Sequence, residues 1–486
     1  MQSTNWRPIC LLPTIYKLYS GLLALRLSRW LEGNERLPMA QKGFRKFNGC
    51  HEHNFVATTL LDQTRRQRRC LYQVWYDLRN AFGSLPQELM WRVLRHLGVK
   101  HNFVARCQDI YAGSAFVITN AVDGATDPVR QEVGVYQGCP LSPLLFIAAL
   151  VPLVRRLEQL DGVGVPLVEG VRPCVTAYAD DLKVFSDSAD GIRRCHGVVT
   201  RFLSWTGLRA NPAKCASLAV KKDSHGNAIR DDDMCLELHG DVIAPLSLQE
   251  SYTYLGVGDG FDHVHHRLQL APKIQQVKRE AVALIQSGLA PWQVVKALKT
   301  YVYPKVEYAL RHLRPLQSQL QGFDRTVSKG LRHLLRLPQS TTTEFFYSPT
   351  SGGGLGLQSL VEMHQALQVA HAWQMLHSKD SAVAAVALAQ VRQAARKRYR
   401  LQEEHWRGRD VELARLFLNS QLAASPNAEV LRRNGDIGSL WVDVQRILST
   451  LHLSLTERAD TTSTDPLDFV CRITASGSTT KSFRDT

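Results

Sequence analysis

The sequence lacks the cysteine pattern of a disulfide scaffold or a zinc-binding module. Its 10 cysteines are scattered along 486 residues, and no two of them form a C-x-x-C pair. Closely spaced cysteine pairs are the usual ligands of structural zinc, and dense cysteines are typical of small secreted proteins. The histidine-rich stretches HEH (51–53) and HVHH (263–266) have no partners at zinc spacing. The spacing predicts reduced thiols in an intracellular protein.

Long hydrophobic runs are also missing. The longest run, PLLFIAALVPLV at 143–154, is shorter than the roughly 20 residues that span a bilayer, and Pro152 interrupts it. The first ten residues, MQSTNWRPIC, have no basic-then-apolar signal. We therefore expect no membrane association, and we expect residues 143–154 to form a buried helix.

The composition is that of a basic globular protein. Hydrophobic residues make up 44% of the chain and charged residues 21%, which permits a large buried core. Lys and Arg total 59 against 44 Asp and Glu, so the formal net charge is +15. Such a surplus suits a polyanionic partner, and nucleic acid fits it better than an acidic membrane surface.

The hydrophobic pattern changes along the chain and predicts four segments. Strand-like runs such as CLYQVWYDL alternate with helix-like runs such as PQELMWRVLRHLG over residues 1–260, which predicts a mixed α/β region. Helical spacing dominates 261–336 and resumes within 337–453. Residues 454–486 are rich in Ser and Thr with little periodicity, so we predict a disordered tail there.

Two neighbouring carboxylates, Asp180 and Asp181, interrupt the β-forming stretch TAYADDLKVF. A solvated surface hairpin is one explanation. The other comes from Asp77, which closes the apolar strand in LYQVWYDLRNAF. Strand-end carboxylates that converge in a cleft repel each other unless a cation joins them, and Mg²⁺ prefers such oxygen ligands. Two ions about 4 Å apart would suit phosphoryl transfer. Because strand side chains alternate, we expect Asp180 to be the stronger ligand.

Seven segments in order resemble the reverse transcriptases of non-LTR (LINE-type) retrotransposons. They are NWRPICLLPTIYK, QKGFRKFNG, YDLRNAFGSLP, QGCPLSPLLF, AYADDL, GLRANPAKC and YTYLGV, spread over residues 5–257. The resemblance implies an α+β right-hand polymerase in which 1–260 form the fingers and a ferredoxin-like antiparallel palm. Residues 261–336 would form a helical thumb, and 337–453 a C-terminal helical region.

The resemblance also implies roles for individual residues. Asp77, Asp180 and Asp181 match the metal-binding catalytic carboxylates, and Lys214 matches a lysine near the leaving pyrophosphate. Nucleotide binding falls on Phe82, Gln137, Gly138, Arg7, Lys17 and Arg45. Phe82 would lie under the incoming sugar and clash with a 2′-hydroxyl. Tyr254, Leu255 and Gly256 match the primer grip. From the residues alone, Phe82 also suits a core aromatic, Lys214 a surface lysine, and 254–256 a plain β-turn.

The implied function is an RNA-directed DNA polymerase that uses an RNA template, a nucleic-acid primer and dNTPs, with two Mg²⁺ ions or Mn²⁺ in their place. Gly83 stands where many relatives carry Asp, at a position that does not bind metal. The chain begins inside the first finger motif and shows no endonuclease signature, which suggests a partial element. The alternative is an inactive, element-derived nucleic-acid-binding protein.

Two basic runs add candidate phosphate contacts. These are RRQRR at 65–69 and RKRYR at 396–400, the second followed by Trp406. Arginines beside aromatic residues bind phosphates and stack on unpaired bases. A solvated helix face explains either run equally well, and both are compatible with nuclear import.

Overall fold

The computed structural model describes residues 9–120, 124–262, 264–399, 408–424, 439–456, 472–475 and 480–482. The chain divides into two compact units, Met1–Asp262 and His263–Thr486. The domain boundaries expected at 260, 336 and 453 stay predictions. Arg7, Trp406 and most of the expected tail lie outside the described residues.

The first unit is built around a sheet with the strand order β12-β8-β1-β7-β6, with β9 paired to β8. The strands are β1 (Leu71–Tyr76), β6 (Val175–Tyr178), β7 (Asp181–Ser186), β8 (Ala216–Lys222), β9 (Ala228–Arg230) and β12 (Ala244–Pro245). β1 is antiparallel to both β7 and β8, and β6 is antiparallel to β7, whereas β12 runs parallel to β8. The four long strands follow the chain order βαββαβ, which confirms the expected ferredoxin-like palm.

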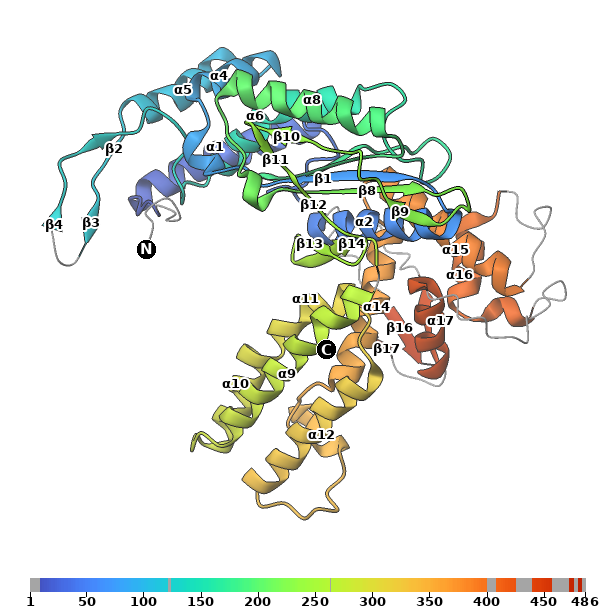
Figure 1. Cartoon of the computed structure of the whole chain (residues 1–486). Helices are drawn as coiled ribbons and strands as arrows, with labels where there is room; N and C mark the ends of the chain where they lie inside the picture. The colour runs from blue at the N-terminus through green and yellow to red at the C-terminus, as the bar shows by residue number, and fades with distance from the viewer. Residues whose placement is uncertain are drawn as a thin grey trace. The chain divides into compact units, whose positions relative to one another are not determined.

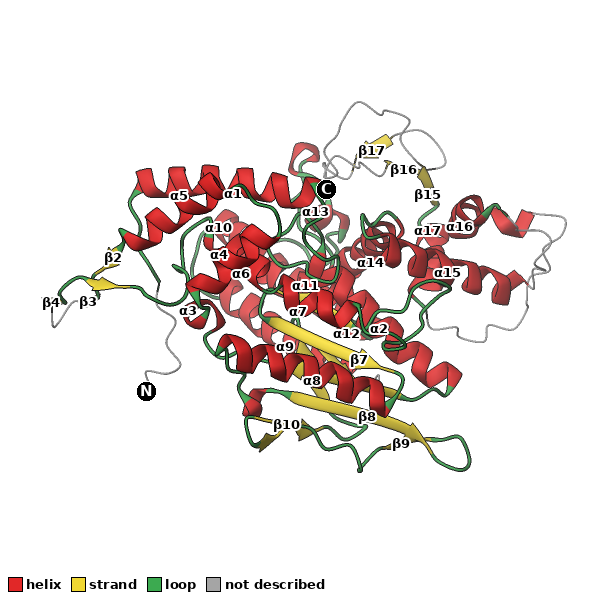
Figure 2. Cartoon of the chain, turned by 90° about the horizontal axis from the view of Figure 1, so that it is seen from above, coloured by secondary structure: helices red, strands yellow, loops and turns green. Residues whose placement is uncertain are grey.

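Both faces of this sheet are covered. Helix α8 (Ala189–Thr206) lies on one face, and Figure 2 shows it in front of the sheet beside β7 and β8. Helix α2 (Gly49–Gln67) lies on the other face together with the hairpin of β13 (Ser251–Tyr254) and β14 (Val257–Gly260) (Figure 1). All six residues of β1 are buried as a result. A central strand covered on both faces reads as a continuous apolar run, here LYQVWY, instead of an alternating pattern.

The apolar run at 143–154 forms two short helices instead of one. Helix α6 (Ser142–Ala149) and helix α7 (Val151–Glu158) meet at Leu150. Pro143 and Pro152 each occupy the first turn of a helix, where no backbone N–H is needed. Almost every residue of the run is buried, so the expected burial is correct and the break follows from the second proline.

The remaining elements of the first unit surround this core. The helices are α1 (Thr14–Gly33), α3 (Ala81–Ser84), α4 (Gln87–His96), α5 (His101–Ala112) and a 3₁₀ turn at Pro212–Lys214. Two short ribbons form a narrow arm that extends from the end of α5 (Figure 1). The short strands are β2 (Ala115–Phe116), β3 (Thr119–Asn120), β4 (Gly124–Ala125), β5 (Val129–Arg130), β10 (Glu237–Leu238) and β11 (Asp241–Val242).

The second unit is mainly helical. Its helices are α9 (Val264–Ile285), α10 (Pro291–Ala297), a π-helical turn (Leu298–Val302), α11 (Pro304–His312), α12 (Gln317–Leu334), α13 (Glu344–Tyr347), 3₁₀ turns at Thr350–Gly352 and Gln421–Ala424, α14 (Leu360–Leu376), α15 (Ser381–Tyr399), α16 (Asp410–Leu418) and α17 (Leu440–Thr450). Its strands are β15 (Leu453–Thr456), β16 (Arg472–Ala475) and β17 (Thr480–Ser482). Helix α14 packs on α11 and α12. In the sequence, the polar segment 337–357 lies between α12 and α14.

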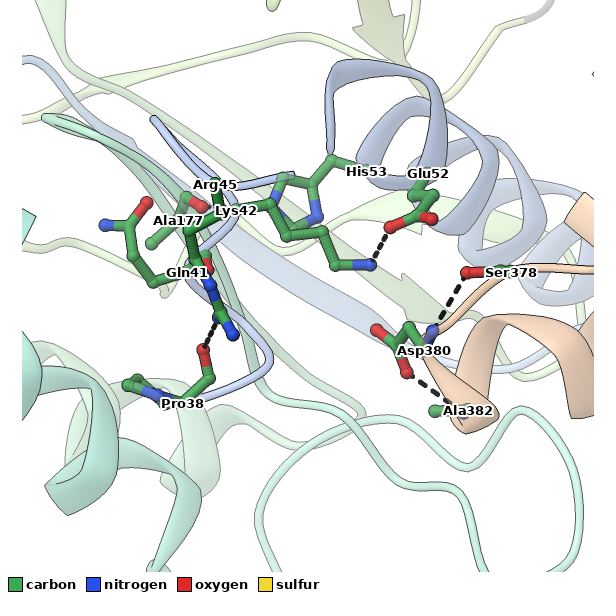
Figure 3. Close-up of polar contacts among 10 residues, drawn as sticks. All are labelled: Pro38, Gln41, Lys42, Arg45, Glu52, His53, Ala177, Ser378, Asp380 and Ala382. Atoms are coloured by element: carbon green, nitrogen blue, oxygen red, sulfur yellow. Dashed lines mark hydrogen bonds and ion pairs between the residues drawn. The ribbon is translucent and has the colours of Figure 1, made fainter. Parts of the chain in front are cut away.

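Helix α15 has a side-chain cap at its N-terminus. Asp380 accepts a hydrogen bond from the Ala382 N–H at 3.0 Å and donates its own N–H to Ser378 at 3.1 Å (Figure 3). A side chain that accepts from the first helical N–H groups stabilises a helix N-terminus. Across the residues that the structure describes, no helix combines the length and the apolar character needed to cross a bilayer.

Candidate active site

Three strand ends bring the candidate residues to one end of the sheet. Tyr76 is paired with Leu182 across β1 and β7. Asp77 directly follows Tyr76 and Asp181 directly precedes Leu182, so one further step of the same register sets the two carboxylates opposite each other. Asp77 is half-buried and Asp181 is exposed.

The third strand end fixes the backbone of Asp77. Its N–H donates to the Cys215 sulfur at 3.4 Å, and its carbonyl accepts from the Asn211 N–H at 2.8 Å. Burial is the main reason why the pKa of the Cys215 thiol is raised, to about 11, so this group remains protonated near neutral pH. The loop before β8 therefore holds Asp77 at the strand end.

Tyr252 shows that the two carboxylates share one side of the sheet. Its ring stacks on Trp75, with centroids 5.2 Å apart. The pKa of the Tyr252 hydroxyl is raised to about 12, mainly by burial and to a smaller extent by the nearby charges of Asp77 and Asp181. Both carboxylates thus lie near the hydroxyl, on the face that β13 and β14 cover.

Asp180 occupies a tight turn between β6 and β7. Tyr178 and Asp181 form the closing pair, so Ala179 and Asp180 are the two turn residues. Ala179 has a φ of 55°, in the left-handed region that non-glycine residues enter only at an energetic cost. Asp180 is half-buried. The expectation that Asp180 is the stronger metal ligand stays a prediction. The strand register sets Asp181, and not Asp180, opposite Asp77.

The side chain of Gln41 holds this strained turn. Its Nε2 donates to the Ala179 carbonyl at 3.1 Å, and its Oε1 accepts from the Ala179 N–H at 2.9 Å. The same oxygen accepts from the Gly43 N–H at 2.9 Å. Gln41 is 0% exposed. One buried amide therefore satisfies both backbone groups of the residue before Asp180.

Residues 40–43 form a short parallel bridge along β6. The Ala177 N–H donates to Ala40, the Lys42 N–H donates to Ala177, and the ring of His53 contacts the same Ala177 carbonyl at 2.9 Å. A Cβ on Gly43 would lie 2.3 Å from the Ala179 nitrogen, so only glycine fits there. Lys42 itself forms a buried ion pair with Glu52 (Figure 3).

Gln41 is not among the residues that the sequence predicts for the site, although it begins the motif QKGFRKFNG. A glutamine in a loop gives no signal of its own, and the close approach that excludes a side chain at 43 becomes visible only in the fold. Gly43, two residues after Gln41, is the local sign of such a close approach.

Arg45 has a structural role in this fold. Its guanidinium donates to both carboxylate oxygens of Glu32, at 2.8 and 2.7 Å. It also donates to the carbonyls of Pro38 and Gln41, each at 2.7 Å, and Figure 3 shows Arg45 beside Pro38. The side chain is 3% exposed. Its predicted contact with a triphosphate would require these four hydrogen bonds to break, whereas their loss would loosen the turn that carries Gln41.

Phe82 packs between two other aromatic rings. It stacks on Phe146 of α6, with centroids 4.2 Å apart, and meets the edge of Phe44 at 5.9 Å. The ring is half-buried, so part of it remains accessible. Both the sugar-contact role and the core role are compatible with this position.

Gln137 and Gly138 lie against the N-terminal segment. The Cys10 N–H donates to the Gln137 carbonyl at 2.8 Å. Gly138 has a φ of 119°, and a Cβ there would lie 2.8 Å from the Cys10 carbonyl. The backbone at Gly138 therefore lies close to Cys10 of the same chain, and the nucleotide-binding role of Gln137 and Gly138 stays a prediction.

The candidate cations differ in placement. Lys214 is exposed and ends the 3₁₀ turn Pro212–Lys214. Asn211 and Cys215, which bond to the Asp77 backbone, flank this turn, so Lys214 lies at the carboxylate end of the sheet. Lys17 is exposed on α1, and Arg7 lies outside the described residues. Their roles stay predictions.

The predicted primer-grip residues form a tight hairpin. Leu255 and Gly256 join β13 to β14, with φ values of 45° and 78°. Two consecutive positive φ values are typical of a type I′ turn. Tyr254 is buried, and its hydroxyl lies 2.9 Å from that of Thr176 on β6. Tyr254 therefore faces the sheet, and its part in gripping a primer stays a prediction.

The donor chemistry fits a hard divalent cation. Asp77, Asp180 and Asp181 offer carboxylate oxygens, which Mg²⁺ prefers, and the register sets two of them opposite each other. Among the described residues, however, no group of three His, Cys, Asp or Glu side chains converges as a complete metal site. Waters and nucleotide phosphates supply many of the ligands of Mg²⁺ in such enzymes, so an incomplete protein shell is compatible with binding.

Comparisons with known proteins agree with this geometry. The family model for reverse transcriptase (RNA-dependent DNA polymerase) matches residues 2–258. A Pol polyprotein of the R2 retrotransposable element from Popillia japonica is 27% identical over 74% of this chain and 49% of its own length. The R2DM Pol polyprotein from Drosophila melanogaster is 26% identical, over 73% and 32%. The chain thus spans about half or less of these relatives.

Among solved structures, telomerase from Candida albicans aligns over 76% of this chain and 56% of its own, with 12% identity and a TM-score of 0.35. The family match covers more than half of the sequence and all the strand ends described above. The chain therefore belongs to the reverse transcriptase family and, within it, is similar to the non-LTR retrotransposon members.

Proposed function

We propose that this chain is an RNA-directed DNA polymerase that extends a DNA or RNA primer with dNTPs on an RNA template. The observation that carries the proposal is the placement of Asp77 opposite Asp181, with Asp180 in a turn that Gln41 holds. The family membership supports the same reaction. Under this proposal the protein acts inside the cell, and the nucleus is a candidate location.

In this proposal the three aspartates hold two Mg²⁺ ions. When bound, the ions would lower the pKa of the primer 3′-hydroxyl and neutralise charge on the reacting phosphates. The turn that Gln41 holds would limit the movement of Asp180 and Asp181 relative to Asp77, which would lower the reorganisation needed during the reaction.

Other side chains would position the nucleotide. Phe82 would contact the sugar and exclude a 2′-hydroxyl. Lys214, at the carboxylate end of the sheet, would offset charge on the departing pyrophosphate and could donate a proton to it. Gln137 and Gly138 would line the path of nucleotide and template, and Lys17 and Arg7 would contact the triphosphate.

The test compares Asp180→Asn and Asp77→Asn with Asp187→Asn, which changes an aspartate just beyond the opposite end of β7. We expect the first two variants to lower primer extension by about 10²–10³-fold or more, the scale of lost electrostatic stabilisation. RNA affinity should change less than about twofold in all three, since one removed negative charge adds no phosphate contact. Full extension by Asp180→Asn and Asp77→Asn would refute the catalytic proposal and leave nucleic-acid binding as the function.

A further inference from the structure

A basic hollow lies at the end of the sheet opposite to the carboxylates. It has a volume of about 220 Å³ and belongs entirely to the first unit. β1 starts beside it at Leu71 and ends just before Asp77. At a rise of about 3.3 Å per residue, the six residues of β1 put about 20 Å between the hollow and Asp77. The residues that matter here are Arg65, Arg68, Arg69, Lys222, Phe261 and the turn 226–228.

Most of the positive charge around this hollow is uncompensated. Arg65 pairs with Asp62 at 2.5 Å. The side chains of Arg68 and Lys222, by contrast, make no hydrogen bond or ion pair with any residue that the structure describes. Arg69 makes one long contact, 3.4 Å to a backbone carbonyl. Three cations thus face the hollow without an acidic partner in the described part of the chain.

Lys221, the neighbour of Lys222 on β8, has acidic partners. Lys221 contacts Asp231 at 2.8 Å and Asp233 at 3.0 Å. Because side chains alternate along a strand, Lys222 points to the other side, toward the hollow. The strand therefore carries one compensated lysine and one uncompensated lysine.

Helix stabilisation does not explain this cluster. Cations in the last turn of a helix interact favourably with its dipole, and this accounts for Arg65 and Arg66 at the end of α2. Arg68 lies past the helix with a φ of 50°, and Lys222 comes from a separate strand. The charges converge through the tertiary fold.

The opposite wall of the hollow is rigid. Asp223 accepts hydrogen bonds from the backbone N–H groups of His225 and Asn227, at 2.8 and 2.7 Å, and these close the β8–β9 turn. Gly226 in this turn has a φ of 78°, and a Cβ there would lie 3.9 Å from an Arg68 nitrogen. The cations and the hydrogen-bonded turn thus line one concave surface.

We infer that this hollow binds phosphodiester groups of a polynucleotide at a second site, separate from the catalytic end. Arginine and lysine side chains without acidic partners are suited to phosphate oxygens. Half-buried Phe261 lies 5.9 Å from the Arg65 guanidinium and offers a ring on which an unpaired base can stack. The site would hold a stretch of polynucleotide about 20 Å from the reacting end, which is the length of β1.

The test measures binding of the full chain to a single-stranded RNA of about 30 nucleotides and to a DNA duplex of about 30 base pairs. Binding is measured without dNTPs over a range of salt concentrations. Arg68→Gln/Arg69→Gln removes two contacts, and Lys222→Gln removes one from the other wall. Each lost contact should reduce the slope of log affinity against log salt by about 0.7 for the single strand or 0.9 for the duplex. The polymer with the larger change identifies the natural ligand.

The matched control is Arg106→Gln/Arg230→Gln, which removes the same charge from two exposed arginines already paired with Asp109 and Asp232. An equal slope change in the control, or unchanged slopes in the hollow variants, would overturn the inference. Primer extension on a short template should stay within about twofold of the parent, because the hollow lies one strand length from the carboxylates. Binding and catalysis are therefore scored independently.

Discussion

Lys183 and Asp259 form an ion pair in the interior of the first unit, with 2.5 Å between Nζ and Oδ2 and exposures of 1% and 5%. The same carboxylate oxygen accepts from the Trp75 indole N–H at 3.0 Å. Lys183 lies two residues after Asp181 on β7, whereas Asp259 lies on β14. The pair thus fastens the β13–β14 hairpin to the strand that carries a candidate catalytic carboxylate.

Lys183→Met should destabilise the first unit strongly. It leaves Asp259 as an uncompensated buried charge, and breaking such a pair costs about 3–5 kcal/mol. Asp259 Oδ1 has no hydrogen-bond partner among the described residues, so the charge has little other support. Urea denaturation measures the free energy of unfolding.

The double variant Lys183→Met/Asp259→Asn removes both charges and keeps an acceptor for Trp75. It should recover part of the lost stability, because the remaining groups are neutral. Lys222→Met, on the exposed end of β8, serves as the control and should change stability by less than about 0.5 kcal/mol. A loss below about 1 kcal/mol in Lys183→Met, the range of exposed pairs, would mean that the pair contributes no more than a surface salt bridge.

Gln41→Leu should reduce the rate of synthesis without reducing RNA affinity. Leucine has nearly the same size but leaves the N–H and carbonyl of Ala179 without their buried partners. Each unsatisfied buried group costs about 1–3 kcal/mol, so the strained turn should relax and displace Asp180. We expect kcat for primer extension to fall by about tenfold or more, since small displacements of catalytic groups have large effects.

Gln63→Leu provides the matched control for this prediction. That glutamine also donates to a backbone carbonyl, Leu167 at 3.0 Å, but does not touch the turn. It should keep its kcat. Equal kcat values for Gln41→Leu and the parent, with both proteins folded, would show that the turn keeps its geometry without this amide.

The sequence predicted the carboxylates and the sheet but not what holds them in place. Asp77 and Asp180 are predicted as site residues because a charge at the end of an apolar strand is conspicuous, and the family resemblance implies the ferredoxin-like sheet. Gln41, Lys183 and Asp259 were missed because their roles depend on partners far away in the chain. A parallel bridge pairs Gln41 with Ala177 and brings its side chain to Ala179, and no local pattern reveals this pairing.

Arg45 shows the reverse case. A cation in a finger motif suggested phosphate binding, yet Glu32 and two backbone carbonyls enclose it in the fold. Composition and spacing cannot tell a buried structural arginine from an exposed binding one, because both types occur in the same basic motif.

Phe82→Val should weaken discrimination against ribonucleotides. Under the proposed function the ring excludes a 2′-hydroxyl, and valine removes that steric barrier. We expect the ratio of kcat/KM for dNTP over rNTP to fall by about tenfold or more, which corresponds to about 1.4 kcal/mol. Single-nucleotide incorporation on a primed RNA measures this ratio.

Phe44→Val controls for general loosening of the aromatic cluster. Phe44 meets the edge of Phe82 without stacking on Phe146 as Phe82 does. It should leave the ratio within about twofold, since the barrier itself remains. If both variants lowered the ratio equally, Phe82 would be a core aromatic and the nucleotide gate would lie elsewhere.

His196 should make the first unit less stable in mild acid. Its ring is hydrogen-bonded to the Tyr76 hydroxyl at 2.8 Å and to the Glu237 carbonyl at 2.9 Å. Burial holds the pKa of His196 below its ordinary value, against a smaller opposing effect of the Glu237 carbonyl. The unfolded chain, with a histidine pKa of about 6.5, then binds a proton more readily than the folded one.

The contribution of His196 is therefore complete above pH 6.5 and is lost as the pH falls from there toward the lower folded-state pKa. The loss cannot exceed about 1.4 kcal/mol per pH unit for one proton. Urea denaturation at pH 7.5 and pH 5.5 should show a smaller drop in the free energy of unfolding for His196→Asn than for the parent. His225→Asn, at an exposed position, should keep the parental drop. Identical pH dependence in His196→Asn and the parent would mean that the ring is protonated without disturbing its two partners.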